Sequence, residues 1–149
     1  MFWVIRFVLF WTVWLVFADK KRWREIIPVS VFASFLSSSS DNIMHQYHLW
    51  VYDTEETSFI ADMTDDWSVY LVIAYLFIQW LPKEQTLGRM LKYMFLWTGV
   101  VILIEYIHVA SGHMTYSYWW NIHLSYFADW ILFVMIYQYH KIFHFERLL

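Results

Sequence analysis

Five long apolar runs, separated by short polar segments, organise the chain. A bilayer core about 30 Å thick takes roughly 17–25 helical residues to cross, and only the third run is clearly shorter than that. The pattern predicts an all-α fold, a polytopic transmembrane helix bundle that forms a single domain over residues 1–149. The five predicted helices cover residues 2–18, 26–45, 67–81, 90–110 and 119–139.

The two prolines help to place the ends of these helices. Pro28 falls in the first turn of the second predicted helix, where a missing N–H costs nothing. Pro82 stops the third predicted helix, which offers only Tyr75 and Gln79 as polar groups. We therefore expect the third helix to be the peripheral one.

Composition strengthens the membrane prediction and excludes other classes of protein. Hydrophobic residues make up 60% of the chain, aromatic residues 23% and charged residues 15%, against roughly 45–50% apolar and about 25% charged in soluble domains. A soluble domain this small has too little interior for so many large apolar side chains, so we expect the excess to face lipid. The absence of cysteine excludes a disulfide scaffold, and a net charge of -3 without a basic patch gives no support for a nucleic-acid partner.

Charge asymmetry predicts the orientation of the helices. Lysine and arginine follow the first, third and fifth runs, whereas the loop after the second run is acidic. Because cytoplasmic loops are enriched in basic residues, we predict a plasma-membrane protein with its N-terminus outside and its C-terminus in the cytoplasm. The histidines of the tail, His140 and His144, are expected on an amphipathic segment along the inner surface. The basic residues are Lys20, Lys21, Arg22, Arg24, Lys83, Arg89, Lys92, Lys141 and Arg147, and the acidic ones are Asp53, Glu55, Glu56, Asp62, Asp65 and Asp66.

Polar residues repeat at helical spacing on three of the predicted helices. A stripe of this kind on the second helix suits close packing of helices, since serines let backbones approach, but packing alone does not explain a buried aspartate. The stripe consists of Ser30, Ser34, Ser37, Asp41, His45 and His48. The fourth helix carries Glu105 and His108, and the fifth carries Asn121, Ser125 and Asp129.

Convergence of these faces predicts an outward-facing polar cavity with aromatic walls. Ionisable groups inside a membrane are costly and usually functional, although a purely structural network of ion pairs is the alternative. Arg6 is the candidate ion-pair partner for Asp41 or Glu105. The candidate ligand- or proton-binding residues are Asp41, Glu105, His108, Asn121, Ser125 and Asp129. The candidate ligands of a divalent metal are His45, His48, Glu105 and His108.

Three segments also carry a resemblance to a known family. They are IEYIH at 104–108, GHMTY at 112–116 and WWNIHLS at 119–125. With these motifs the chain resembles an uncharacterised family of small polytopic membrane proteins from spore-forming Gram-positive bacteria. The resemblance implies a bacterial plasma-membrane protein with several helices, and it implies no activity. The matching positions are Asp41, Glu105, Tyr106, Tyr116, Trp120, Asn121 and Ser125, whereas His45, His48 and His108 fall outside the family pattern.

The sequence leaves three functions open. The first is binding or transport of a cation, a proton or a small ligand in the polar cavity, by a chain that we expect to form a homo-oligomer in the lipid bilayer. The second is a membrane enzyme that acts on a lipid-like substrate, with Glu105 and His108 as an acid–base pair or with a metal. The third is a non-catalytic assembly partner that uses the serine stripe and the acidic loop. We rank the enzyme below the other two, since the sequence shows no phosphate-binding, zinc-protease or serine-hydrolase motif.

Overall fold

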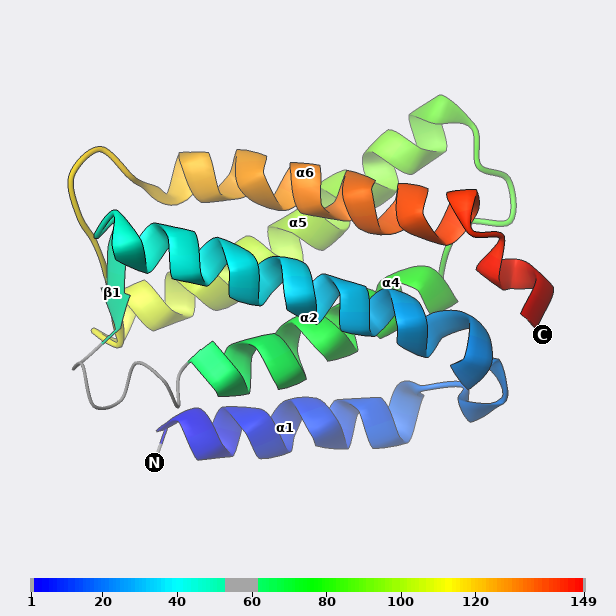
Figure 1. The fold of residues 1–149 in the computed structure, drawn as a ribbon, viewed down its shortest axis with the longest axis horizontal. Coiled ribbons are helices and arrows are strands. Elements are labelled where there is room, and N and C mark those ends of the chain that lie inside the picture. The colour runs from blue at the N-terminus through cyan, green and yellow to red at the C-terminus, as the bar shows by residue number, and fades with distance from the viewer. Residues whose placement is uncertain (1, 53–61, 149) are drawn as a thin grey trace.

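A computed structural model describes residues 2–52 and 62–148, and it is mostly helical. Five long helices form a bundle, which confirms the predicted number and all-α class (Figure 1). The predicted acidic residues Asp53, Glu55 and Glu56 lie outside the described residues. The helices are α1 (Phe2–Phe17), α2 (Trp23–Gln46), α4 (Leu71–Gln79) with the π-helical segment η2 (Asp65–Tyr70) before it, α5 (Leu87–Ala110) and α6 (Ile122–Ile142).

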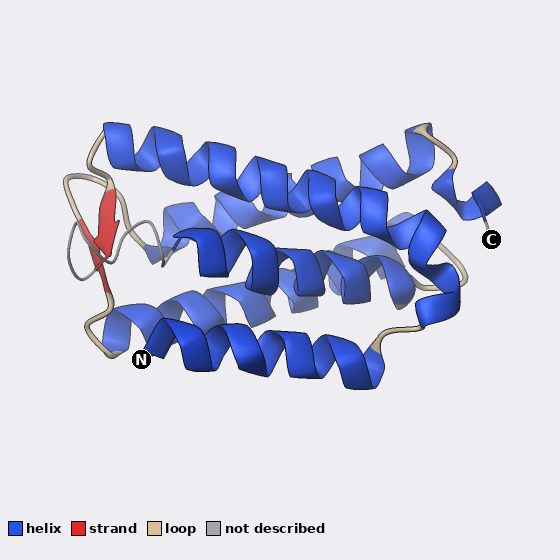
Figure 2. Cartoon of the chain, turned by 60° about the horizontal axis from the view of Figure 1, so that its bottom comes forward, coloured by secondary structure: helices blue, strands red, loops and turns tan. Residues whose placement is uncertain are grey.

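The helices lie lengthwise beside one another, and their connections fall at the two ends of the bundle (Figures 1 and 2). One end holds the N-terminus and two short strands, β1 (Trp50–Tyr52) and β2 (Met114–Tyr116). The strands pair antiparallel, with Val51 opposite Thr115, so the connections that follow α2 and α5 are joined at this end. We call it the strand end. The C-terminus lies at the opposite end.

Two helix starts differ from the prediction. The second helix begins at Trp23, so Pro28 lies inside it and not in its first turn, which corrects the predicted placement. The last helix begins later than predicted, because Asn121 caps it: its side chain accepts hydrogen bonds from the backbone N–H groups of His123 and Leu124. Such a cap satisfies N–H groups that have no partner inside the helix.

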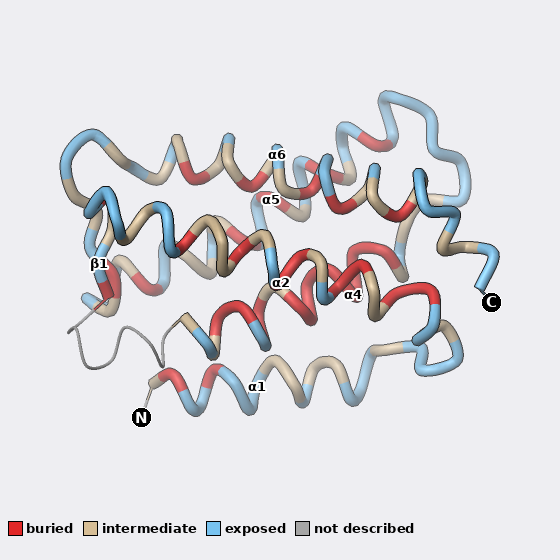
Figure 3. Tube along the Cα trace, in the orientation of Figure 1, coloured by how far each residue is buried: buried red, intermediate tan, exposed pale blue. Residues whose placement is uncertain are grey.

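The third helix is the centre of the bundle, which corrects its predicted peripheral position. Every residue of α4 from Leu71 to Ile78 is buried, and the helix packs on α1, α2 and α6 (Figure 3). A helix that is apolar on every side is a core helix in a folded bundle. Its few polar side chains are used at its C-terminal end, where the Tyr75 hydroxyl donates to the backbone carbonyl of Asp19 (2.9 Å).

Helix length and hydropathy support fewer membrane spans than the five predicted. Of the described helices, α5 alone is long and apolar enough to cross a bilayer by itself. One further pair of segments meets the length and hydropathy criterion only when the two are taken together. They are Phe2–Phe17 and Lys20–Gln46, and the second is bent by 97° relative to the first. With its 16 residues, α1 extends for about 24 Å at 1.5 Å per residue, which is shorter than a bilayer core.

A buried ionic cluster holds together the end opposite the strands. Glu25, which is fully buried, receives two hydrogen bonds from Arg22, both of 2.7 Å. The same carboxylate lies 2.9 Å from Nε2 of His140 on α6. Arg22 also donates to the backbone carbonyl of Gln79 at the end of α4 (2.9 Å). His140 is thus buried in the bundle and not on the surface segment predicted for the tail.

Candidate functional site

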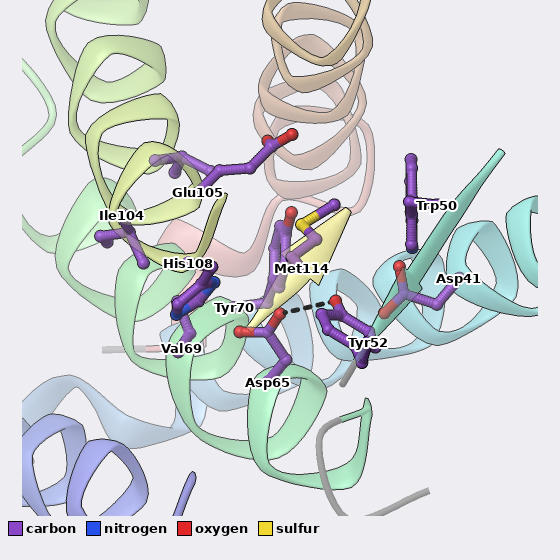
Figure 4. Close-up of a pocket in the computed structure, with 11 residues that line it drawn as sticks. Asp41, Trp50, Tyr52, Asp65, Val69, Tyr70, Ile104, Glu105, His108 and Met114 are labelled. Atoms are coloured by element: carbon purple, nitrogen blue, oxygen red, sulfur yellow. Dashed lines mark hydrogen bonds between the residues drawn. The ribbon is translucent and has the colours of Figure 1, made fainter. Parts of the chain in front are cut away.

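The polar residues predicted on separate helices meet at the strand end of the bundle (Figure 4). There α2, η2 and α5 enclose a cavity of about 40 Å³, which is room for one to a few water molecules. Asp41, Glu105 and His108 line it, and Trp50, Tyr52 and Met114 of the two strands cover it. The pairing of β1 with β2 therefore brings residues of both strands into the wall of this cavity.

Arg6 forms its ion pair with Asp65, not with the predicted Asp41 or Glu105. The guanidinium Nη1 lies 3.1 Å from a carboxylate oxygen of Asp65, and both side chains are buried. The reason is packing: α1 contacts η2, whose first residue is Asp65. The sequence placed Asp65 in an acidic loop, whereas the structure places it in the helical segment that precedes α4.

The Arg6 guanidinium also contacts other side chains. It donates to Oγ1 of Thr64 (3.1 Å) and contacts Nε2 of His108 at 3.0 Å, and it stacks over the ring of Trp3. Arginine has no acceptor, so the His108 nitrogen must accept this hydrogen bond and the ring must be neutral. The side chain of His108 is therefore part of a structural network that joins α1, η2 and α5.

Glu105 is bound by a different network from that of His108. The Tyr116 hydroxyl of β2 donates to Oε1 of Glu105, and Ser125 is a second hydrogen-bond neighbour of Glu105. Burial, followed by the interaction with Glu105, raises the pKa of Tyr116 and keeps its hydroxyl protonated. Trp120 in turn donates to Oγ of Ser125 (2.9 Å). The pair of residues predicted as acid and base thus has separate partners.

A second, larger cavity of about 370 Å³ lies between α2 and α6 at the same end. Asp41 and Glu105 line both cavities, and Asp129 lines the larger one. The exposed fractions of Asp41 and Asp129 are 7% and 5%. Within the described residues, one oxygen of each carboxyl group, Oδ2, is buried without a hydrogen-bond partner. Buried polar atoms are normally paired, so these two oxygens mark a place where a ligand can bind.

Aromatic residues complete the larger cavity, and of these the sequence analysis named only Trp120, through the family resemblance. Trp50, Tyr70 and Trp120 line it, and Tyr70 is a hydrogen-bond neighbour of Asp129. The ring planes of Trp50 and Trp120 meet edge to face, with centroids 5.5 Å apart. No helical spacing indicated Trp50, because it lies on β1, outside the helices.

The remaining predicted site residues lie elsewhere. Asn121 is an exposed cap of α6 and lines neither cavity. His45 faces Asp62, with Nδ1 and Oδ2 3.4 Å apart, and His48 lies in a turn with φ of 55°. Of the four predicted metal ligands, only Glu105 and His108 line a common cavity. Within residues 2–52 and 62–148, no three His, Asp or Glu side chains are grouped to hold a metal ion.

The serine stripe of α2 packs against η2. The Ser34 hydroxyl donates to the backbone carbonyl of Asp66 (2.6 Å), and Ser30 donates to the carbonyl of Ile26 in its own helix (3.1 Å). Both serines and Ser37 are buried. The stripe therefore joins α2 to η2 through Ser34, and Ser37 and Asp41, one turn apart, both line the larger cavity.

The comparisons with protein families, with curated proteins and with solved structures find no match to this chain.

Asp62 is expected to make the stability of this end depend on pH. Burial, followed by the negative charges of Asp66 and Asp65, raises the pKa of Asp62 to about 7. Because the unfolded value is about 3.9, the folded state binds this proton more tightly, and the stabilisation is lost as the pH rises from about 4 to about 7. Among the described residues, His45 also faces Asp62. We expect Asp62→Asn to raise the melting temperature at pH 8 relative to the unmodified protein and to change it little at pH 4. If the melting temperatures of the two proteins differed by the same amount at every pH in this range, the raised pKa of Asp62 would be contradicted.

Proposed function

We propose that the chain is an integral membrane protein of the plasma membrane, with all five helices embedded and the strand end outside. The proposal rests on the surface of the bundle. The apolar side chains of α5 are largely exposed, unlike those of a core helix in a soluble protein, and large apolar residues are exposed on α1 and α6 as well. Soluble proteins rarely expose such extensive apolar surface. Examples are Val4, Val8, Val16, Phe95, Leu96, Leu103, Phe127 and Ile131.

The distribution of charge supports the same orientation. Basic residues gather at the end of the bundle opposite the strands. They belong to the segment after α1 and to the neighbourhood of the ends of α4 and α6. The described acidic residues Asp62, Asp65 and Asp66 lie at the strand end. Short helices can be accommodated by local thinning of the bilayer, which allows α1 and α4 to be embedded although each is shorter than a full span.

We further propose that the protein binds a small cation in the larger cavity. The observation that carries the proposal is that Asp41 and Asp129 line one cavity from facing helices, each with a buried oxygen that lacks a partner within the described residues. Carboxylates buried without a positive partner are costly, and a bound cation removes that cost. The rings of Trp50, Tyr70 and Trp120 can add cation–π attraction.

Binding of methylammonium tests this proposal. We expect calorimetric titration of the protein in mild detergent to show saturable binding, and Asp41→Asn and Asp129→Asn each to weaken it by about tenfold or more, since each removes a charge-assisted hydrogen bond. Glu84→Gln is the matched control, because Glu84 is an exposed acid paired with Arg89 at the other end of the bundle. Equal binding by all four proteins would refute the proposal. Unchanged helical circular dichroism would show that the variants are folded.

A further inference from the structure

The larger cavity is polar at one side and aliphatic over the rest of its wall. Its carboxyl groups come from Asp41, Glu105 and Asp129. No lysine, arginine or histidine is among its lining residues in the described chain, so no basic side chain there pairs with these acids. The aliphatic part of the wall consists of Leu36, Ile43, Met44, Ile131, Leu132 and Met135.

This aliphatic wall reaches the side of the bundle. Ile43 on α2 and Ile131 on α6 line the cavity and are nonetheless 52% and 62% exposed. Towards the opposite end the same two helices are in contact, where Phe32 stacks on Tyr139 with ring centroids 4.1 Å apart. The cavity therefore opens sideways between α2 and α6, at a level where the proposed membrane position puts lipid chains.

We infer that the occupant of this cavity is an amphiphilic amine with an aliphatic chain. The ammonium group lies against the carboxyl groups of Asp41 and Asp129, and the chain lies between α2 and α6 along Ile43 and Ile131. Charge complementarity selects the cationic head, since the lining holds three acids and no base. The aliphatic wall selects the chain, and a volume of about 370 Å³ is within the usual range for small-molecule sites. This inference rests on the proposed cation site and specifies its ligand.

The head group is tested with dodecylamine at a fixed mole fraction in lipid nanodiscs, measured by native mass spectrometry of the full chain. We expect one bound dodecylamine per chain, and at least about tenfold less of the complex with dodecanol, which lacks the charge. Asp41→Asn and Asp129→Asn are expected to reduce dodecylamine binding by a similar factor, whereas Glu84→Gln leaves it unchanged. Equal binding of dodecanol and dodecylamine would overturn the inference, since the carboxyl groups would then select nothing.

The lateral opening is tested with a variant at its rim. Ile131→Trp adds bulk at an exposed position, so it is expected to leave folding intact and to reduce dodecylamine binding by about tenfold. If methylammonium binds and dodecylamine does not, the cation site stands and the amphiphile is wrong. If neither amine binds to the unmodified protein, both proposals fail. If the rim variant binds dodecylamine normally, the chain does not lie between α2 and α6.

Discussion

Replacement of Arg6 by methionine is expected to lower the free energy of unfolding by about 3–5 kcal/mol, because it leaves a buried carboxylate without its positive partner. The side chain of Asp65 is only 11% exposed, so water cannot replace the guanidinium. Nε2 of His108 loses its donor as well. Methionine retains the length of the aliphatic stem, so the loss reports mainly on charge and hydrogen bonding. Chemical unfolding in mild detergent, followed by tryptophan fluorescence, measures it.

Arg89→Met is the matched control for this prediction. Arg89 also forms an ion pair, with Glu84 at 2.6 Å, but both side chains are more than half exposed. Exposed pairs contribute about 0–1 kcal/mol, so this variant should be close to neutral. Asp65→Asn in the Arg6→Met background should recover part of the lost stability, since it removes the unpaired charge. A loss at Arg6 no larger than that at Arg89 would show that the buried pair is not formed.

The second large effect is expected at the opposite end of the bundle, from Glu25→Gln. We expect this substitution to lower the free energy of unfolding by about 3 kcal/mol, because the amide offers one acceptor oxygen where the carboxylate binds both Arg22 and His140. The side chain of Arg22 is 26% exposed and can be partly hydrated, so the loss should not exceed that at Arg6. The same unfolding measurement applies.

Glu84→Gln provides the control for Glu25→Gln, since it makes the same chemical change at an exposed acid. His140→Ala should destabilise as well, and the double variant Glu25→Gln, His140→Ala should lose less than the sum of the two single losses. Strict additivity would mean that Glu25 and His140 do not interact. Because this cluster joins α2 and α6 far from the cavity, methylammonium binding by the folded variants should be unchanged.

The helices could be predicted from local pattern because apolar runs of helical length are a property of contiguous sequence. All five runs became helices, with shifted ends where a cap such as Asn121 acts locally. The position of α4 within the bundle could not be predicted from local pattern. An apolar helix suits both the centre of a bundle and its lipid-facing edge, and only the packing of α1, α2 and α6 around it decided for the centre.

The candidate site was predictable in part for the same reason. Asp41, Glu105 and Asp129 were selected because an acid within an apolar helix is conspicuous, and the structure places all three around one cavity. Trp50 and Tyr70 were missed, since nothing local distinguishes them among so many aromatic residues. The partner of Arg6 was also missed, since Asp65 looked like one more residue of an acidic loop.

The sequence by itself determined the helical class, the number of helices and the residues that carry charge into apolar segments, because each depends on neighbours within a few turns. Only the tertiary structure decided which of those charges are paired. Asp65 lies 59 positions from Arg6 in the chain and meets it only because α1 packs on η2. Asp41 and Asp129 lie on helices that are brought together, and among residues 2–52 and 62–148 no positive side chain lines the cavity between them. Such pairings depend on contacts between distant segments, and helical periodicity contains no information about them.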